Sequence, residues 1–162
     1  MSVIEAEQEA AKLLETSWNP RPLPVDPFQL ARGLGIDISF TPMPADVSGR
    51  IEIVPDTTPH IWINSNDGQS RQRFTCAHEI GHYLRRSDGD QSEVFIDWRD
   101  ILAGLGTNET EIFANQFAAA LLMPAHEVAS YFGRKFSTEE MARQFGTSAQ
   151  AMEIRLRNLR LV

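Results

Sequence analysis

Two histidines four residues apart, His78 and His82, constrain the fold of this chain more than any other feature of its sequence. The apolar residues around them recur at helical spacing, and we expect a helix from an N-cap at Ser70 to about Leu84. Residues four apart on a helix lie one above the other, so both imidazoles project from one face. Another element must therefore lie opposite this face and complete the group that the histidines begin.

The chemistry that this pair favours is metal binding. Imidazole nitrogen is a good ligand for Zn²⁺, and two histidines supply half of a tetrahedral shell, although Mn²⁺ and Fe²⁺ stay open as alternatives. Glu79 follows the first histidine directly, so its carboxylate leaves the helix beside the metal position rather than on it. There it can act as a general base, which accepts a proton from an attacking water and passes it to a leaving amine. The plain alternative is a pair of core-edge histidines hydrogen-bonded to backbone.

A catalytic zinc site needs a third protein ligand, and the sequence favours a carboxylate for this position. Glu111 is the best candidate because it shares a helical face with Asn115, which can orient a ligating histidine through its second ring nitrogen. A capping box provides another role for Glu111, since Asn108 is a suitable N-cap three residues before it. Glu109 is the reserve ligand. The third ligand thus stays open between two glutamates of one predicted helix.

Two segments together resemble a known family. The run from Arg73 to Leu84 (RFTCAHEIGHYL) and the run from Glu111 to Pro124 (EIFANQFAAALLMP) resemble the ImmA/IrrE family of metallopeptidases. The resemblance implies a gluzincin-like, zincin-like site with His78, His82 and Glu111 as ligands and Glu79 as base. It also implies an endopeptidase with a regulatory role, in which cleavage of a cytoplasmic helix-turn-helix repressor releases genes of mobile elements or of a stress response.

Two rival functions accompany this expectation. The first is a non-catalytic regulator that uses the same metal site to hold its fold and binds a repressor without cutting it. The second is a DNA-binding protein that uses the C-terminal helices, where Arg155, Arg157 and Arg160 add basic character. A net charge of −7 argues against direct binding of nucleic acid or of an anionic membrane. A protein substrate is therefore the expected partner, and the oligomeric state stays unknown.

Composition and apolar pattern indicate an α+β protein in the cytoplasm. The single cysteine, Cys76, excludes a disulfide framework, and no run approaches the roughly 20 apolar residues of a membrane span. Strands are expected at 36–40, 48–54 and 60–63, and together they predict a small antiparallel sheet packed on a helical core. We expect one metallopeptidase domain over residues 1–162: helices and sheet in 1–69, the metal-site helices in 70–124, and C-terminal helices in 125–162. The segment 87–106 is expected to be a long loop.

One strand offers a place for substrate. Residues 60–64, with Ile61, Trp62 and Ile63, read as a strand that can lie at the sheet edge beside the histidine helix. An extended substrate adds to such an edge through main-chain hydrogen bonds. Tyr83 is included as a substrate contact because it is one of several residues able to donate a hydrogen bond to the developing oxyanion. The alternative for Trp62 is a core position in a half-buried strand.

Overall fold

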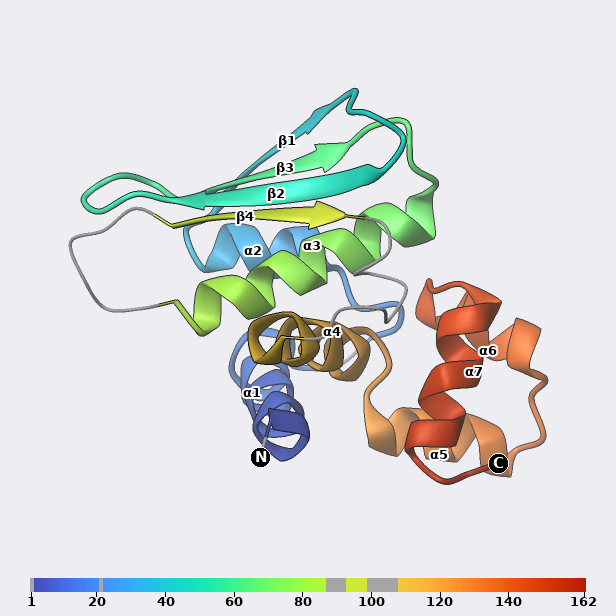
Figure 1. Ribbon diagram of the computed structural model, residues 1–162. Coiled ribbons are helices and arrows are strands. Elements are labelled where there is room, and N and C mark those ends of the chain that lie inside the picture. Colours follow the sequence, from blue (N-terminus) through green and yellow to red (C-terminus); the bar gives the residue numbers. More distant parts are fainter. Residues whose placement is uncertain (1, 21, 87–92, 99–107) are drawn as a thin grey trace.

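The computed structural model of the chain describes residues 2–20, 22–86, 93–98 and 108–162 (Figure 1). These residues include no helix with both the length and the apolar character of a membrane-spanning segment. The elements in chain order are α1 (Ser2–Ser17), α2 (Pro27–Gly33), β1 (Asp37–Thr41), β2 (Val47–Ile53), β3 (His60–Asn64), α3 (Gln69–Leu84), β4 (Glu93–Trp98), α4 (Glu109–Leu122), α5 (Ala125–Gly133), α6 (Thr138–Phe145) and α7 (Ala149–Asn158).

The α+β class is confirmed, and the small sheet is mixed rather than purely antiparallel. Its strand order is β1-β3-β2-β4. Strand β2 is antiparallel to β3 and to β4, whereas β1 runs parallel to β3. The expectation of a sheet that is antiparallel throughout is wrong for the β1–β3 pair, because β3 inserts between β1 and β2 and separates strands that are neighbours in sequence.

A fourth strand lies where a loop was expected. Strand β4 occupies Glu93–Trp98 and pairs with β2 from Val47 to Ile53. Its register shifts between Val47 and Gly49, the mark of a bulge. The remainder of the expected loop, residues 87–92 and 99–106, lies outside the described residues. The polar residues on either side concealed the short apolar run Val94-Phe95-Ile96, which becomes a strand through its pairing with β2.

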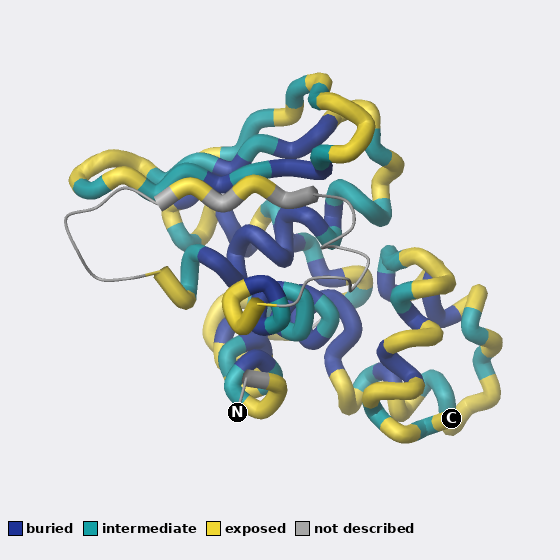
Figure 2. The backbone as a smooth tube through the Cα atoms, viewed as in Figure 1, coloured by how far each residue is buried: buried dark blue, intermediate teal, exposed yellow. Residues whose placement is uncertain are grey.

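All helices lie on one side of the sheet (Figure 1). Helices α2 and α3 pack beneath the strands, α4 packs on α3, and α1 packs on α4. The buried side chains of Ile51, Ile61 and Ile63 line the helical side of the sheet, and Figure 2 shows the buried residues concentrated between the strands and α3. Because side chains alternate across a strand, His60 and Trp62 fall on the opposite face, where their rings stack 3.8 Å apart.

Gly49 permits the sheet to approach the histidine helix closely. A Cβ atom at this position would lie 2.6 Å from Cγ2 of Thr75 and 2.7 Å from the carbonyl oxygen of Trp62. A larger residue would therefore push β2 away from α3 or from β3. Thr75 is one turn before His78, so this glycine helps to set the distance between the sheet and the histidines.

A buried arginine ties the start of α3 to two distant segments. Arg73 Nε donates to the carbonyl of Gly146, and Nη2 donates to the carbonyls of Val25 and Phe145, at 2.9, 2.6 and 3.3 Å. The side chain is only 8% exposed. Burial lowers the pKa of Arg73, and nearby Asp26 opposes that effect. The helix itself begins at Gln69 after an N-cap at Gly68, so the expected cap at Ser70 is wrong by two residues.

The C-terminal helices form a unit beside α4, as Figure 1 shows in orange and red. Ser137 and Glu140 form a capping box at the start of α6, and Ser148 caps α7. Arg155, expected to add basic character to α7, is buried instead. It donates to the carboxylate of Glu7 on α1 and to the carbonyl of Met123. This arginine is therefore committed to structure and is not available to contact nucleic acid.

Candidate metal centre and active site

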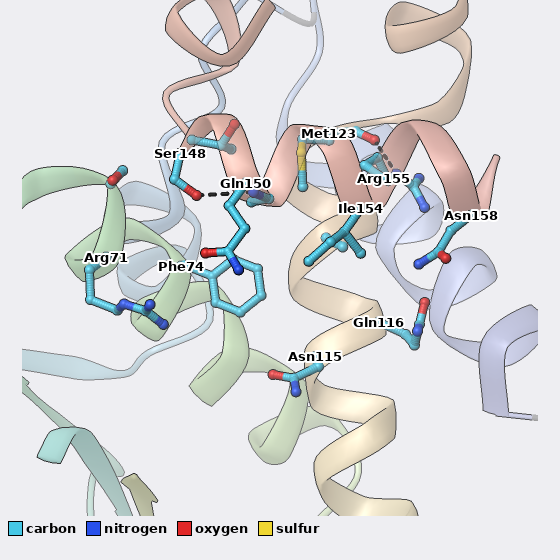
Figure 3. A pocket seen from close by; sticks show the side chains of 14 residues that line it. Arg71, Phe74, Asn115, Gln116, Met123, Ser148, Gln150, Ile154, Arg155 and Asn158 are labelled. Atoms are coloured by element: carbon cyan, nitrogen blue, oxygen red, sulfur yellow. Dashed lines mark hydrogen bonds between the residues drawn. The ribbon is translucent and has the colours of Figure 1, made fainter. Parts of the chain in front are cut away.

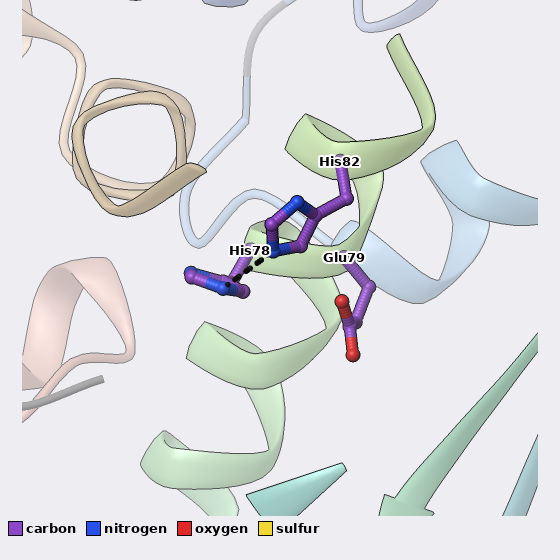
Figure 4. Close-up of side chains that lie close together, drawn as sticks. All are labelled: His78, Glu79 and His82. Carbon is purple, nitrogen blue, oxygen red and sulfur yellow. Dashed lines mark hydrogen bonds between the residues drawn. The ribbon is translucent and has the colours of Figure 1, made fainter. Parts of the chain in front are cut away.

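The two histidines point from α3 toward α4 and meet at one position. Figure 4 shows both imidazoles on the same side of α3, with centroids 4.7 Å apart and planes at 79°. Their Nε2 atoms are 3.1 Å apart. Both side chains are buried, with 0% and 1% of their surface exposed. Two ring nitrogens that face each other at this distance in a buried site can share a proton or bind one metal ion through their lone pairs.

Glu111 on α4 supplies the third group. Its two carboxylate oxygens lie 3.0 Å from Nε2 of His78 and 3.1 Å from Nε2 of His82. Burial alone would raise the pKa of Glu111, but hydrogen bonds with the two histidines, and their charges, lower it to about 2. The carboxylate is therefore ionised at neutral pH. Asn108 caps α4 by accepting from the backbone N–H of Glu111, so N-capping and convergence on the histidines coexist at this residue.

The donor set fits a tetrahedral metal ion. A zinc ion with bonds of about 2.0–2.1 Å holds its ligands about 3.3 Å apart. The two Nε2 atoms are 3.1 Å apart, and each has a different carboxylate oxygen of Glu111 at 3.0 or 3.1 Å, all slightly shorter than that value. Two imidazoles and one carboxylate make the ligand class found in catalytic zinc sites that keep a fourth position open. Glu109, the alternative ligand, is exposed in the first turn of α4 and is absent from this convergence.

Asn115 lies behind His78 and orients its ring. Its Oδ1 atom is 2.8 Å from Nδ1 of His78. Since an amide oxygen only accepts, Nδ1 carries the proton, and this tautomer leaves the lone pair of Nε2 directed at the metal position. Asn115 is one turn after Glu111 on α4, so one helix provides both the carboxylate and the side chain that fixes the tautomer.

The substitution Asn115→Ala should weaken zinc binding about 10–100-fold, the usual effect of losing a group that orients a ligating histidine. The dissociation constant can be measured by competition with a chelating indicator. Asn115→Asp should preserve tight binding, because its carboxylate accepts the same hydrogen bond. Gln116→Ala is the matched control on the neighbouring residue. Equal affinities for the wild type and Asn115→Ala would contradict the orienting role.

Gly81 brings α3 and α4 close enough for the three ligands to converge. A Cβ atom here would lie 3.1 Å from Cα of Ala114 and 3.2 Å from Cδ1 of Phe117. These contacts are tighter than ordinary packing, and the first involves backbone, which cannot rotate away. A glycine inside a helix costs about 1 kcal/mol relative to alanine, and the close helix contact accounts for its use here.

We expect Gly81→Ala to weaken zinc binding although alanine favours the helix, because α4 must retreat and carry Glu111 away from the histidines. Binding can be measured with the same chelator competition, and thermal unfolding gives the accompanying change in stability. Gly33→Ala is the control, since a Cβ at Gly33 meets nothing within 4 Å. An unchanged zinc affinity in Gly81→Ala would show that the helix spacing does not limit the site.

Glu79 lies beside the metal position and is not part of the three-donor convergence. His78, Glu79 and His82 each place one possible ligand atom within 4.8 Å of those of the other two residues. The side chain of Glu79 is fully buried. Figure 4 shows its carboxylate directed to a different side from the two imidazoles. At this distance the carboxylate can reach a water in the open position and exchange a proton with it.

The proposed substrate strand is not at an edge. Strand β3 is hydrogen-bonded to β1 on one side and to β2 on the other, so its backbone cannot pair with a substrate. Ile61 and Ile63 are fully buried core residues. Trp62 lies on the outer face between His60 and the guanidinium of Arg50, which is 4.5 Å from its ring centre. The edge-strand role expected for Ile61, Trp62 and Ile63 is therefore wrong.

Tyr83 is half-buried next to His82 and lies one turn beyond Glu79 on α3. The guanidinium of Arg86 covers its ring at 3.9 Å. The structure thus places Tyr83 near the candidate base, and its contact with substrate stays a prediction.

Sequence reasoning missed a cavity that α3, α4 and α7 enclose. Phe74 lies one turn before His78, and Ala119 lies two turns after Glu111; both line this cavity. Helical spacing alone could have indicated these two positions. No sequence signal pointed to the third wall, which Ala151 and Ile154 of α7 provide.

A buried cluster of two histidines and a glutamate shared by two packed helices, with a second glutamate beside it, is typical of metal-dependent hydrolases. A family model described as the IrrE N-terminal-like domain, of a peptidase family, matches residues 31–157. The chain belongs to this family, which confirms the resemblance to the ImmA/IrrE metallopeptidases.

Three curated relatives are similar to the chain. The radiation response metalloproteases IrrE of Deinococcus deserti and Deinococcus radiodurans are 37% and 33% identical over 131 and 129 residues, or 76% and 78% of this chain. The chain spans 44% and 34% of their lengths, less than half of each. An uncharacterized immunity region protein 2 of Bacillus phage phi105 is 25% identical over 130 residues, covering 80% of this chain and 78% of the relative.

Proposed function

We propose that the chain is a zinc-dependent endopeptidase that cleaves a specific protein, a helix-turn-helix transcriptional repressor, in the cytoplasm. The observation that carries the proposal is the convergence of His78, His82 and Glu111 with Glu79 alongside. The names of the Deinococcus relatives support a metalloprotease activity, and the name of the phage relative, an immunity region protein, supports a regulatory target.

Each residue of the site has a separate role in the proposed hydrolysis of a peptide bond. His78, His82 and Glu111 would hold the ion, and Asn115 would keep His78 in the required tautomer. When bound, the metal would polarise the scissile carbonyl and lower the pKa of the attacking water. Glu79 removes a proton from that water as its oxygen bonds to the carbonyl carbon. The same carboxyl then gives the proton to the nitrogen as the C–N bond breaks.

Strand β4, at the edge of the sheet opposite to β1, offers a place for an extended substrate. In the part of the chain that the structure describes, β4 pairs only with β2, and it contacts α3. Val94 and Ile96 of β4 are 53% and 45% exposed. A substrate segment that adds to β4 through main-chain hydrogen bonds would run past the histidine helix. This strand takes the role that the sequence assigned to β3.

The direct test is cleavage of a candidate repressor by the zinc-loaded chain. Helix-turn-helix proteins encoded beside the gene are incubated with the purified protein, and intact-mass spectrometry identifies the products. We expect two fragments from one of them, their formation abolished by a chelator and restored by added zinc. Failure to cut any such protein, together with failure to cut a blocked random peptide library, would contradict peptidase activity.

A further inference from the structure

A cavity of about 330 Å³ lies between α3, α4 and α7 (Figure 3). The α3 residues that line it come from the first half of the helix, before His78. Phe74 comes from α3, Ala119 and Met123 from α4, and Ala151 and Ile154 from α7. These five side chains make a largely apolar interior. A volume near 300 Å³ is at the small end of the range for ligand sites, which suits one large side chain and part of its backbone.

The cavity and the metal centre share the same two helix faces. Phe74 precedes His78 by one turn, about 6 Å along α3, and Ala119 follows Glu111 by about 12 Å along α4. Asn115 lies between them, lining the cavity while its Oδ1 accepts from His78. An extended chain advances about 3.3–3.6 Å per residue, so a peptide held at the metal centre would reach this cavity about two to four residues from the cut bond.

The residues that line the cavity favour a substrate side chain that is apolar. Ile154 is 38% exposed, an apolar surface that an incoming side chain would cover. Side-chain amides of Asn115, Gln116, Gln150 and Asn158 surround the apolar interior and can pair with peptide N–H and C=O groups.

Two arginines that line the cavity disfavour the binding of a basic substrate side chain there. Arg71 and Arg155 both line the cavity. Arg155 is buried and balanced by Glu7, so it does not create a demand for an acidic ligand. A lysine or arginine side chain would leave water for an interior whose charged lining residues, Arg71 and Arg155, are both cationic and offer it no carboxylate partner, which disfavours it.

We propose that this cavity is the subsite that receives a large apolar side chain of the protein substrate, about two to four residues from the scissile bond. The proposal rests on the proposed peptidase function and extends it to substrate specificity. Helix α7 is then part of the substrate-recognition surface, since it supplies one wall of the subsite.

Binding tests the cavity without requiring activity. Blocked tripeptide amides, acetyl-Gly-X-Gly-amide with X as Leu, Phe or Lys, are titrated into the ¹⁵N-labelled, metal-free protein at millimolar concentration. The Leu and Phe probes should shift the side-chain amide signals of Asn115, Gln116 and Gln150, and the Lys probe should not. Ala151→Trp, which fills the cavity, should abolish the shifts, whereas Glu153→Trp on the exposed side of α7 should preserve them.

Cleavage of a blocked random peptide library by the zinc-loaded protein tests the role in specificity. We expect about tenfold enrichment of Leu, Phe or Met at one position about two to four residues from the cut, equivalent to about 1.4 kcal/mol. Ile154→Asp, a change at an already exposed position, should remove this preference while circular dichroism stays that of the wild type, and Glu153→Trp should retain it.

The results of these two experiments distinguish a failure of the subsite proposal from a failure of the proposed peptidase function. A wild-type protein that binds the Leu and Phe probes in the cavity but cuts no peptide would contradict the proposed peptidase function. The subsite proposal would then fail too, because there would be no substrate for the cavity to select. A wild type that cuts the library without apolar preference, or whose preference survives Ala151→Trp, would overturn the subsite alone. Absence of shifts with all three probes would also overturn it.

Discussion

Replacing Glu79 by glutamine is expected to lower kcat for peptide-bond cleavage about 10²–10⁴-fold while zinc stays bound, because the amide cannot take a proton from the attacking water. Glutamine has nearly the same shape as glutamate and does not alter His78, His82 or Glu111. Metal content after dialysis and the single-turnover rate on one cleaved substrate measure the two effects separately.

The control for Glu79→Gln is Glu139→Gln, which removes an acidic group from the first turn of α6. This variant should cleave at the wild-type rate. A Glu79→Gln protein with full activity would exclude the assigned base. If the variant cannot cut but still relieves repression in cells, the non-catalytic regulator that binds a repressor becomes the better description.

Glu111→Ala should weaken zinc binding by more than about 100-fold, since even the groups that only orient a ligand contribute about 10–100-fold. The loss has a clear geometric cause: the carboxylate lies within 3.1 Å of both histidine nitrogens. Competition with a chelating indicator gives the dissociation constant, and elemental analysis gives the stoichiometry.

Glu109→Ala is the matched control for Glu111→Ala because it changes the same residue type in the same turn of α4. Glu109 is exposed, so its loss should leave zinc binding unchanged. Weakened binding in Glu109→Ala with normal binding in Glu111→Ala would reverse the assignment of the third ligand.

The local parts of the structure followed from local sequence. Asp26 accepts hydrogen bonds from the backbone of Phe28 and Gln29 at the start of α2, as expected from an N-cap followed by proline. The helix that holds His78 and His82 followed from apolar spacing, and the close approach at Gly81 followed from the presence of glycine inside a helix. Each of these features depends on residues within one or two turns of the chain.

The features that could not be predicted from the sequence depend on contacts between residues that are far apart in the chain. Alternating apolar residues predicted β3 but could not show that β1 lies on one side of it and β2 on the other. That topology decides whether Trp62 lines an edge or an interior strand. The cavity beside the metal centre is a stronger case, because Phe74 and Ile154 are 80 positions apart and meet only in the folded chain.

The hydrogen bonds of Arg73 make the histidine helix sensitive to events far from the metal. Its guanidinium would collide with a side chain at Gly146, where a Cβ atom would lie 2.7 Å from Nε, and Gly146 also has a φ of +68°. A residue other than glycine at position 146 is therefore expected to displace the Arg73 guanidinium from its hydrogen bonds to Gly146 and Phe145. Arg73 lies five residues before His78, so the same change would loosen the attachment of the histidine helix to the turn between α6 and α7.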